Sequence, residues 1–242
     1  MSENLNLTWR QRATWMSHFS KAALRDHHQE MEPLFGPLIA PDAVICDVGA
    51  HGGQMSRMFA RLAPKGTIHS FEPARYALSV LEAALKFRGA RNIHVWPYAL
   101  SDKEGELTIA TPIKKSSALG YGLAHVAAPG EQGKFRMETS RATTLDTFVA
   151  EQNINRIDFI KVDIEGWELH FLRGADGALK RFRPHLFLEV SANTLERAGE
   201  TPAALFAFMT ERGYKAQMLT EQDTLEPVTG FKANGDYLFS PA

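Results

Sequence analysis

Short apolar runs along this chain alternate with longer segments whose apolar residues recur at helical spacing. A short continuous apolar run suits a strand that is buried on both faces, whereas apolar residues at i, i+3 and i+4 indicate a helix. The pattern predicts strands at 44–47, 67–71, 93–97, 157–162 and 186–190, and helices at 54–62, 75–87, 143–152 and 202–212. Alternation of this kind predicts an α/β protein with a mostly parallel sheet covered by helices on both faces.

The segment 111–141 fits no regular element, although the residues before it, 106–110, alternate like a half-exposed strand. A long loop inside a compact domain is uncommon and is often a lid or a binding loop. We therefore expect 111–141 to be a lid or substrate loop, with a disordered surface excursion as the alternative. Two runs near the end of the chain, 214–219 and 236–239, are expected to pair in antiparallel fashion.

The N-terminal part of the chain, residues 8–32, carries apolar side chains at helical spacing until three prolines interrupt the pattern. Proline cannot continue a helix, so the prolines separate this part from the first strand. The sequence therefore predicts an N-terminal helical extension over 1–42, followed by one domain over 43–242.

The composition limits the class of protein. The 242 residues are 44% hydrophobic and carry a formal net charge of -1, which suits a folded domain with a sizeable core. Near-neutral charge gives no general attraction to nucleic acid or to an anionic membrane, so we expect neither as a partner. The single cysteine, Cys46, cannot form an internal disulfide. No stretch reaches the roughly 18 apolar residues of a membrane span, and no signal peptide is evident, so a cytoplasmic location is expected.

The first predicted strand ends in a glycine-rich turn with the sequence DVGAHGG. Glycines let the backbone approach a ligand closely, and the helix that follows offers unpaired N–H groups. Any tight strand-to-helix turn needs small residues as well, so the turn alone does not decide between a ligand site and a structural turn. The candidate cofactor-binding residues here are Asp47, Gly49, Ala50, His51 and Gly52.

Polar residues also follow the second and third predicted strands. Glu72, followed by Pro73, stands about 20 residues beyond the glycine turn, where an acid can accept both hydroxyls of a ribose. An acid there can instead oppose the dipole of the next helix. Ser101 and Asp102 follow the third strand. They can hydrogen-bond an adenine amino group or simply form a turn.

Two carboxylates follow the apolar strand at 157–162. Asp163 and Glu165, two positions apart at a strand mouth, can orient a substrate, bind a cation or act as a base. The alternative is a solvated charged run that enters a helix. Glu189 lies within the next apolar strand and needs a partner, either Lys161 or an arginine, unless it faces the same cleft.

The glycine turn does not supply the G-x-G-x-x-G pattern of dinucleotide-binding proteins. His51 stands where the second glycine of that pattern is expected, and Asp47 just before the turn would oppose a pyrophosphate. A ligand with a ribose and a cationic amino-acid end fits these residues better. S-adenosylmethionine is such a ligand.

The order of several motifs carries a family resemblance. They are DVGAHGG at Asp47–Gly53, FEP at Phe71–Pro73, ALSDKEGE at Ala99–Glu106, TTLDTF at Thr143–Phe148, DFIKVDIEGWELHFLRGA at Asp158–Ala175, LFLEV at Leu186–Val190 and DYLF at Asp236–Phe239. With them the chain resembles the class I S-adenosylmethionine-dependent methyltransferases and, within these, the FkbM family. The resemblance runs from about residue 44 to the C-terminus and leaves out the N-terminal extension and 111–141.

The resemblance implies a Rossmann-like, seven-stranded sheet whose last strand is antiparallel. It implies S-adenosylmethionine as cofactor, with the first turn at its methionine end and Glu72 at its ribose. Ser101 and Asp102 are then expected near the adenine, and Asp163 near the ammonium group or the reacting methyl. The family commonly has Asn where this chain has His51. It mainly methylates hydroxyls of sugars and secondary metabolites, so the expected partner is a small-molecule hydroxyl acceptor.

Such a reaction needs a base for the hydroxyl proton. Asp163 and Glu165 are the first candidates because they follow a strand, and His170 and His125 come second. A divalent metal is possible but not favoured, because no His-rich or closely repeated acidic pattern demands one. Two alternatives stay open at this point, an NAD-dependent oxidoreductase and a non-catalytic nucleotide-binding module.

Overall fold

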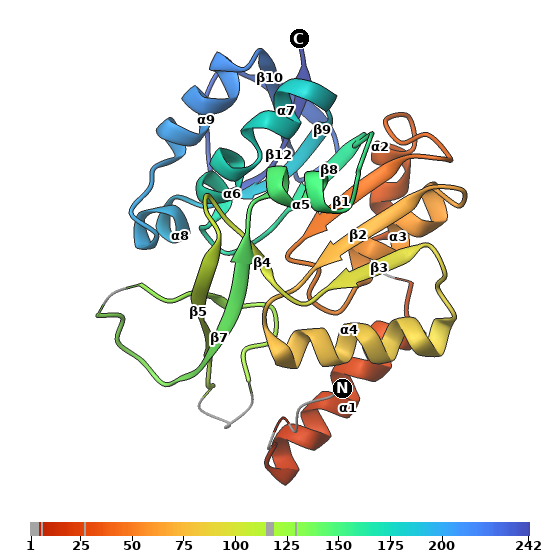
Figure 1. Ribbon diagram of the computed structural model, residues 1–242, viewed down its shortest axis with the longest axis vertical. Coiled ribbons are helices and arrows are strands. Elements are labelled where there is room, and N and C mark those ends of the chain that lie inside the picture. The colour runs from red at the N-terminus through yellow and green to blue at the C-terminus, as the bar shows by residue number, and fades with distance from the viewer. Residues whose placement is uncertain (1–4, 6, 27, 115–118, 129) are drawn as a thin grey trace.

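The centre of the protein is an eight-stranded sheet in the order β11-β10-β12-β9-β8-β1-β2-β3 (Figure 1). The computed structural model describes residues 5, 7–26, 28–114, 119–128 and 130–242. The sheet consists of β1 (Val44–Val48), β2 (Thr67–Phe71), β3 (Ile93–Trp96), β8 (Phe159–Val162), β9 (His185–Val190), β10 (Tyr214–Leu219), β11 (Leu225–Val228) and β12 (Gly235–Pro241). Five of these strands, β3, β2, β1, β8 and β9, run parallel to one another.

The antiparallel last strand of the sequence prediction is confirmed. β12 pairs in antiparallel fashion with both β9 and β10. The prediction of seven strands was one too low, because β11 forms a hairpin with β10 and adds an outer strand. β11 contains Pro227 and is largely exposed, which is typical of an edge strand and leaves little apolar pattern to recognise in the sequence.

Helices cover both faces of the sheet, as predicted. They are α1 (Trp9–Leu24), α2 (Glu32–Phe35), α3 (Gln54–Leu62), α4 (Arg75–Arg88), α5 (Leu145–Glu151), α6 (Glu168–Gly174), α7 (Asp176–Phe182), α8 (Ala192–Arg197) and α9 (Pro202–Glu211), with a 3-10 turn, η1, at Gln29–Met31. Successive strand residues point to opposite faces. Cys46 therefore packs toward α5, α6, α7 and α9, whereas Ile45 packs toward α2, α3 and α4.

A second sheet lies outside the central one, in the order β4-β7-β5-β6. Its strands are β4 (Ala99–Leu100), β5 (Gly105–Pro112), β6 (His125–Val126) and β7 (Phe135–Thr143). Figure 1 shows β5 and β7 extending away from the central sheet. The segment 111–141 was expected to fit no regular element, and this was wrong, because it contains β6 and most of β7. β7 is half-exposed and mixes charged with apolar residues, which obscured its strand pattern; residues 115–118 and 129 of the segment lie outside the described residues.

The N-terminal extension packs along α4 (Figure 1). A capping box between Thr8 and Gln11 begins α1, and the helix ends at Leu24, earlier than the apolar spacing predicted. Arg57 on α3 donates hydrogen bonds to the carbonyls of Ala22 and Arg25 at the C-terminal end of α1. These bonds satisfy carbonyls that a helix end leaves unpaired and tie the extension to the helix that follows the glycine turn.

Candidate active site

Two adjoining cavities open at the carboxyl ends of the parallel strands, where ligands bind in folds of this kind. The first cavity has a volume of about 480 Å³ and the second a volume of about 690 Å³. Both are lined by Gly49, His51 and Asp163. The other residues of the first cavity are Val48, Phe71, Glu72, Pro73, Tyr98, Ala99, Leu100, Ile109, Ala124, His125, Val126, Ile164 and Trp167. Those of the second are His28, Met31, Ala50, Gln54, Met55, Lys161, Val162, Phe187, Glu189 and Asp236.

The glycine turn brings the exit of β1 against the exit of β8. Gly49 has a φ of +78°, and a Cβ atom on it would lie 1.9 Å from the carbonyl oxygen of Asp163. The amides of Gly49 and Ala50 both donate to the carbonyl of Phe71, each at 3.0 Å. A larger residue at Gly49 would force the two strand exits apart. At Gly52, a Cβ atom would lie 1.7 Å from the hydroxyl of Tyr121, so this position is covered by the 111–141 segment.

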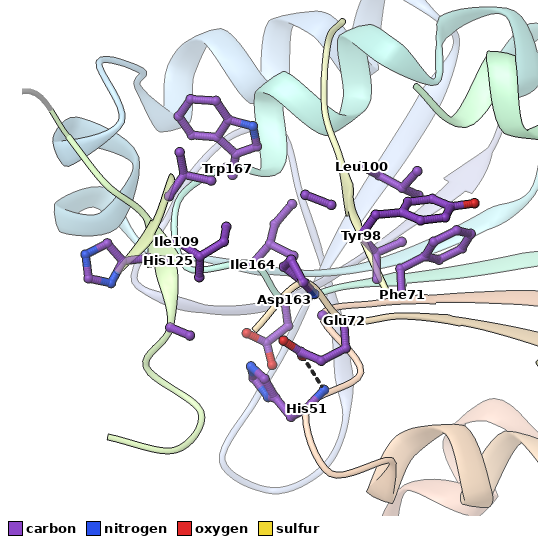
Figure 2. Close-up of a pocket in the computed structure, with 16 residues that line it drawn as sticks. His51, Phe71, Glu72, Tyr98, Leu100, Ile109, His125, Asp163, Ile164 and Trp167 are labelled. Atoms are coloured by element: carbon purple, nitrogen blue, oxygen red, sulfur yellow. Dashed lines mark hydrogen bonds between the residues drawn. The ribbon is translucent and has the colours of Figure 1, made fainter. Parts of the chain in front are cut away.

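Glu72 is fixed in the wall of the first cavity by two backbone amides. Its Oε2 accepts a hydrogen bond from the amide of His51 and its Oε1 from the amide of Ala74, each at 2.8 Å. Figure 2 shows the first of these bonds at the cavity floor, beside Asp163. Glu72 is 2% exposed, and burial raises the pKa of its carboxyl. Each carboxylate oxygen has two lone pairs, so one on each oxygen remains for a ligand hydroxyl.

His51 contributes to the site through its backbone amide. Its φ is +50°, a left-handed conformation that Asn and His adopt more readily than most side chains. This conformation directs the His51 amide toward Glu72, while the residue lines both cavities. The sequence indicated the position of His51 but not this bond to Glu72.

Lys161 joins the two strand exits through its ammonium group, although its side chain is buried. Its Nζ donates to the carbonyl of Gly49 at 2.9 Å. The same atom lies 3.5 Å from Asp47 Oδ1 and 3.4 Å from Asp163 Oδ2. Burial works to lower the pKa of Lys161, but the charges of Asp163 and Asp47 outweigh it and raise the pKa. Lys161 was expected only as a partner for Glu189. A lysine inside an apolar strand, two residues before an aspartate, indicates an ion pair at that strand exit but does not identify Asp47 as the second partner.

Asp47 was expected to face the cationic end of a ligand. The structure places its side chain in the interior, where Oδ2 accepts a hydrogen bond from Ser56 and Oδ1 faces Lys161. Asp47 is not among the described residues that line the two cavities. Lys161 therefore accounts for the acid at this position without any ligand.

Three carboxyl groups meet at the second cavity. Burial alone would raise the pKa of Asp163, but the charges of Lys161 and His51 lower it well below its usual range. Burial and the neighbouring Asp163 raise the pKa of Glu189, which shares a side-chain hydrogen bond with Asp163. Burial and Asp163 also raise the pKa of Asp236 to about 6. Asp163 thus stays ionised at neutral pH, whereas Glu189 retains a proton. Glu189 lines the second cavity, which is one of the arrangements expected for it.

Glu165 lies on the turn that follows Asp163 but lines neither cavity as far as the described residues show. It has a φ of +55°, and Arg197 on α8 donates a hydrogen bond to its carbonyl. Burial and the charge of Asp163 raise the pKa of its carboxyl, while His51 acts to lower it. The carboxyl of Glu165 is therefore close enough to Asp163 and His51 for their charges to change its pKa.

Ser101 and Asp102 support the first cavity from behind. Trp167, which lines this cavity, donates from Nε1 to Ser101 Oγ at 3.0 Å. Ser101 donates in turn to Asp102 Oδ1 at 3.0 Å. The Trp167 ring stacks on His170, with ring centroids 3.8 Å apart. His170 lies 3.6 Å from carboxylate oxygens of Asp102 and Glu200, so it belongs to this support and not to the cavity surface.

His125 belongs to β6 and forms one wall of the first cavity (Figure 2). Its Nε2 lies 2.7 Å from Glu131 Oε1, and its Nδ1 lies 3.0 Å from the carbonyl of Leu123. Both ring nitrogens are thus engaged within the 111–141 segment. This segment therefore contributes to the cavity through His125, Ala124 and Val126.

Comparisons with known proteins identify the family of the chain. Residues 47–216 match the family model described as the methyltransferase FkbM domain. The chain belongs to the FkbM methyltransferase family. It is 25% identical over 173 residues to the 2-O-methyltransferase NoeI of Sinorhizobium fredii, a match that covers 67% of this chain and 68% of NoeI. It is 28% identical over 219 residues to the AMB antimetabolite synthetase AmbE of Pseudomonas aeruginosa, with 78% of this chain and only 10% of that protein covered.

A solved structure shares the fold of this FkbM methyltransferase. It is the methyltransferase FkbM from Methylobacillus flagellatus KT, with a TM-score of 0.52 and 16% identity, covering 95% of this chain and 59% of that one. The Rossmann-like fold is thereby confirmed. None of the helices in the described part of the chain is both long enough and apolar enough to cross a membrane. The described residues also contain no cluster of three or more His, Cys, Asp or Glu side chains arranged to hold a metal ion.

Proposed function

We propose that this methyltransferase transfers the methyl group of S-adenosylmethionine to a hydroxyl oxygen of a small molecule. One observation carries the proposal: a cavity with Glu72 in its wall adjoins a second, polar cavity, and Gly49, His51 and Asp163 line both. The first cavity suits a cofactor and the second an acceptor. Their shared border is where a methyl group would pass from one to the other.

The residues of the first cavity fit the nucleoside part of S-adenosylmethionine. Polar groups are few in the lining of this cavity and apolar side chains predominate, as is usual for small-molecule sites. Glu72 offers one lone pair on each oxygen to the two ribose hydroxyls. Apolar side chains such as Leu100, Ile109 and Ile164 supply the surface that an adenine ring needs. Pro73 lies beside Glu72 in the same wall, and Ser101 and Asp102 act on the adenine side through Trp167.

The methionine end is assigned to the glycine turn. Gly49, Ala50 and His51 line the second cavity at the border with the first. Gly52 leaves room for Tyr121 over the same turn. Asp47 contributes indirectly, since with Lys161 it fixes the position of the Gly49 carbonyl.

Asp163 and Glu165 are the candidate catalytic groups. The bound cofactor supplies a methyl group already activated by its sulfonium, so the chain's task is to align the acceptor hydroxyl and receive its proton. Asp163, ionised at the border of the cavities, can accept a hydrogen bond from that hydroxyl. The chain must also supply a base that receives the hydroxyl proton when the acceptor oxygen is methylated. Glu165, whose pKa is raised, holds a proton more readily than Asp163.

The acceptor is assigned from the second cavity and from a relative. The relative NoeI is named a 2-O-methyltransferase, which supports oxygen as the atom methylated. The second cavity, about 690 Å³ in volume, is lined by hydrogen-bonding groups that include Gln54, Glu189 and Asp236. A small molecule with several hydroxyl groups, such as a sugar, fits such a surface.

The test is transfer of a labelled methyl group from S-adenosylmethionine to a panel of sugars and hydroxylated metabolites, with products analysed by mass spectrometry. The expected result is an O-methylated product together with S-adenosylhomocysteine. Calorimetry with S-adenosylhomocysteine measures cofactor binding separately from the acceptor. If the protein binds neither S-adenosylmethionine nor S-adenosylhomocysteine, or if the methyl group is found on nitrogen or carbon, the proposal is wrong.

A further inference from the structure

The turn between β8 and α6, residues 163–167, is organised around Glu168. The Oε1 atom of Glu168 accepts hydrogen bonds from the amides of Ile164 at 3.2 Å and Gly166 at 3.1 Å. Glu168 is 2% exposed, so its carboxyl is held in the interior beside the turn. A single buried carboxyl oxygen therefore holds two amides of the turn that carries Asp163 into both cavities.

The same turn is in a conformation that needs support from outside. Glu165 has a φ of +55° and Gly166 a φ of +105°. A non-glycine residue with positive φ is strained and persists only where surrounding contacts fix it. Contacts from α8 close one side of the turn: Arg197 donates to the Glu165 carbonyl, and a Cβ on Gly166 would lie 2.1 Å from the Thr194 carbonyl oxygen. Glu168, at the start of α6, supplies the hydrogen bonds to the Ile164 and Gly166 amides.

We propose that Glu168 is a positioning residue of the methyltransferase site, which holds the 163–167 turn so that Asp163 and Ile164 face the cavities. The inference needs no contact between Glu168 and a ligand. It follows from the two turn amides that depend on one carboxyl oxygen, that of Gly166 buried and that of Ile164 partly buried, because an amide left without an acceptor away from water destabilises the closed turn.

The protonation state of Glu168 adds a measurable signature. Burial, together with the charge of Asp163 at the end of β8, raises the pKa of Glu168 to about 7, against the hydrogen bonds from the turn amides, which lower it. The charged group that α8 brings to the turn, Arg197, is directed at the Glu165 carbonyl. His170, in the same helix as Glu168, lies between Asp102 and Glu200.

This raised pKa makes opening of the turn depend on pH. In the open turn Glu168 meets water and its pKa returns to the ordinary value of 4.5, compared with about 7 in the closed turn. A group that binds its proton more tightly in the closed state favours that state at low pH and loses this contribution as pH rises through the higher pKa. The opening equilibrium constant is therefore expected to rise about tenfold between about pH 6 and pH 8.

The test is hydrogen exchange at the amides of Ile164 and Gly166, followed by NMR and divided by the intrinsic exchange rate at each pH. Glu168→Gln keeps an acceptor oxygen and removes the ionisable group. Its amides should stay protected, without the tenfold rise between pH 6 and pH 8. Glu168→Ala removes the acceptor and should raise opening by about tenfold or more. Glu196→Ala, an exposed acid on α8, is the control and should leave both amides unchanged.

Cofactor affinity supplies a second readout, which rests on the proposed function, whereas exchange does not. Calorimetry with S-adenosylhomocysteine at pH 7 should give a Kd for Glu168→Gln within about threefold of the wild-type value and about tenfold weaker binding for Glu168→Ala. If the wild-type protein does not bind S-adenosylhomocysteine, the proposed function fails and exchange alone judges Glu168. The inference is overturned if Glu168→Ala keeps the two amides protected, if Glu168→Gln loses protection as Glu168→Ala does, or if an opened turn still binds S-adenosylhomocysteine normally.

Discussion

The ammonium of Lys161 lies 3.4 Å from the carboxylate of Asp163, where the two cavities meet. The same ammonium lies 3.5 Å from Asp47 and donates to the Gly49 carbonyl. The buried ammonium of Lys161 thus fixes the glycine turn and keeps Asp163 ionised. It also balances the negative charge of Asp47, which is fully buried. Its position explains why two acids from neighbouring strands can share one edge of the sheet.

Replacing Lys161 by methionine is expected to destabilise the fold by about 3–5 kcal/mol, because removal of one partner leaves Asp47 as a buried charge without compensation. Urea unfolding at pH 7 measures the change. The matched control is Lys180→Met, which breaks an exposed pair between Lys180 and Asp176 on α7. Exposed pairs of this kind contribute about 0.5 kcal/mol or less. Equal effects of the two substitutions would contradict the bridging role of Lys161.

Glu72 is expected to contribute to cofactor affinity through the ribose. Glu72→Ala removes the carboxylate that faces the first cavity and also leaves the amides of His51 and Ala74 without an acceptor. S-adenosylhomocysteine binding measured by calorimetry should weaken by about 1–3 kcal/mol. Glu82→Ala, an exposed substitution on α4, should leave the Kd unchanged. An unaltered Kd for Glu72→Ala would remove Glu72 from the cofactor site.

Gly49 and Gly89 allow the effect of backbone strain to be separated from the effect of a close contact with a neighbouring strand. Both have positive φ, but a Cβ on Gly49 would lie 1.9 Å from the Asp163 carbonyl oxygen, whereas a Cβ on Gly89 would meet no atom of the described chain within 4 Å. Gly89→Ala should therefore cost only the strain of the left-handed conformation, about 1–2 kcal/mol. Gly49→Ala should destabilise the protein by clearly more in urea unfolding and should abolish binding of S-adenosylhomocysteine. Similar losses of stability in the two variants would show that the strand exits can separate without penalty.

The pKa of Asp236, about 6 in the folded protein against an ordinary value of 3.8, predicts a pH-dependent stability. Because the folded state binds this proton more tightly, the contribution is present below about pH 4 and is lost as pH rises through 6. Asp236→Asn removes the group, so its stability relative to wild type should increase by about 2 kcal/mol between pH 4 and pH 8. Urea unfolding across this range is the measurement. Asp223→Asn, an exposed substitution in the turn before β11, should show no such trend.

The elements that the sequence predicted correctly are those whose apolar residues are buried. The bounds predicted for α3, β2 and β10 agree with the structure. β7 and β11 were missed because each leaves much of its surface in water, so neither carries a clear apolar pattern. Exposure, and not an unusual conformation, made these strands unrecognisable.

The candidate site was predictable in position but only partly in detail. The rule that ligands bind beyond strand ends was enough to select Glu72 and Asp163, which line the first cavity. The direction of a side chain around a turn depends on contacts from distant segments, such as the ring of Trp167 that bonds Ser101. Asp47 illustrates the limit, since its partner Lys161 is more than a hundred positions away in sequence and no local pattern reveals the pair.

Tyr121 provides the test of whether the 111–141 segment acts as a lid. Its ring stacks on His18 of α1, with centroids 4.3 Å apart, and its hydroxyl lies over Gly52. Tyr121→Ala removes this cover from the glycine turn and should speed dissociation of S-adenosylhomocysteine by about tenfold, equivalent to about 1.4 kcal/mol. Tyr121→Phe keeps the ring and should dissociate at nearly the wild-type rate. Stopped-flow experiments measure the dissociation rate of S-adenosylhomocysteine from both variants. A lid must slow the dissociation of the ligand that it covers. An unchanged dissociation rate for Tyr121→Ala would therefore show that the segment is a fixed wall of the cavity.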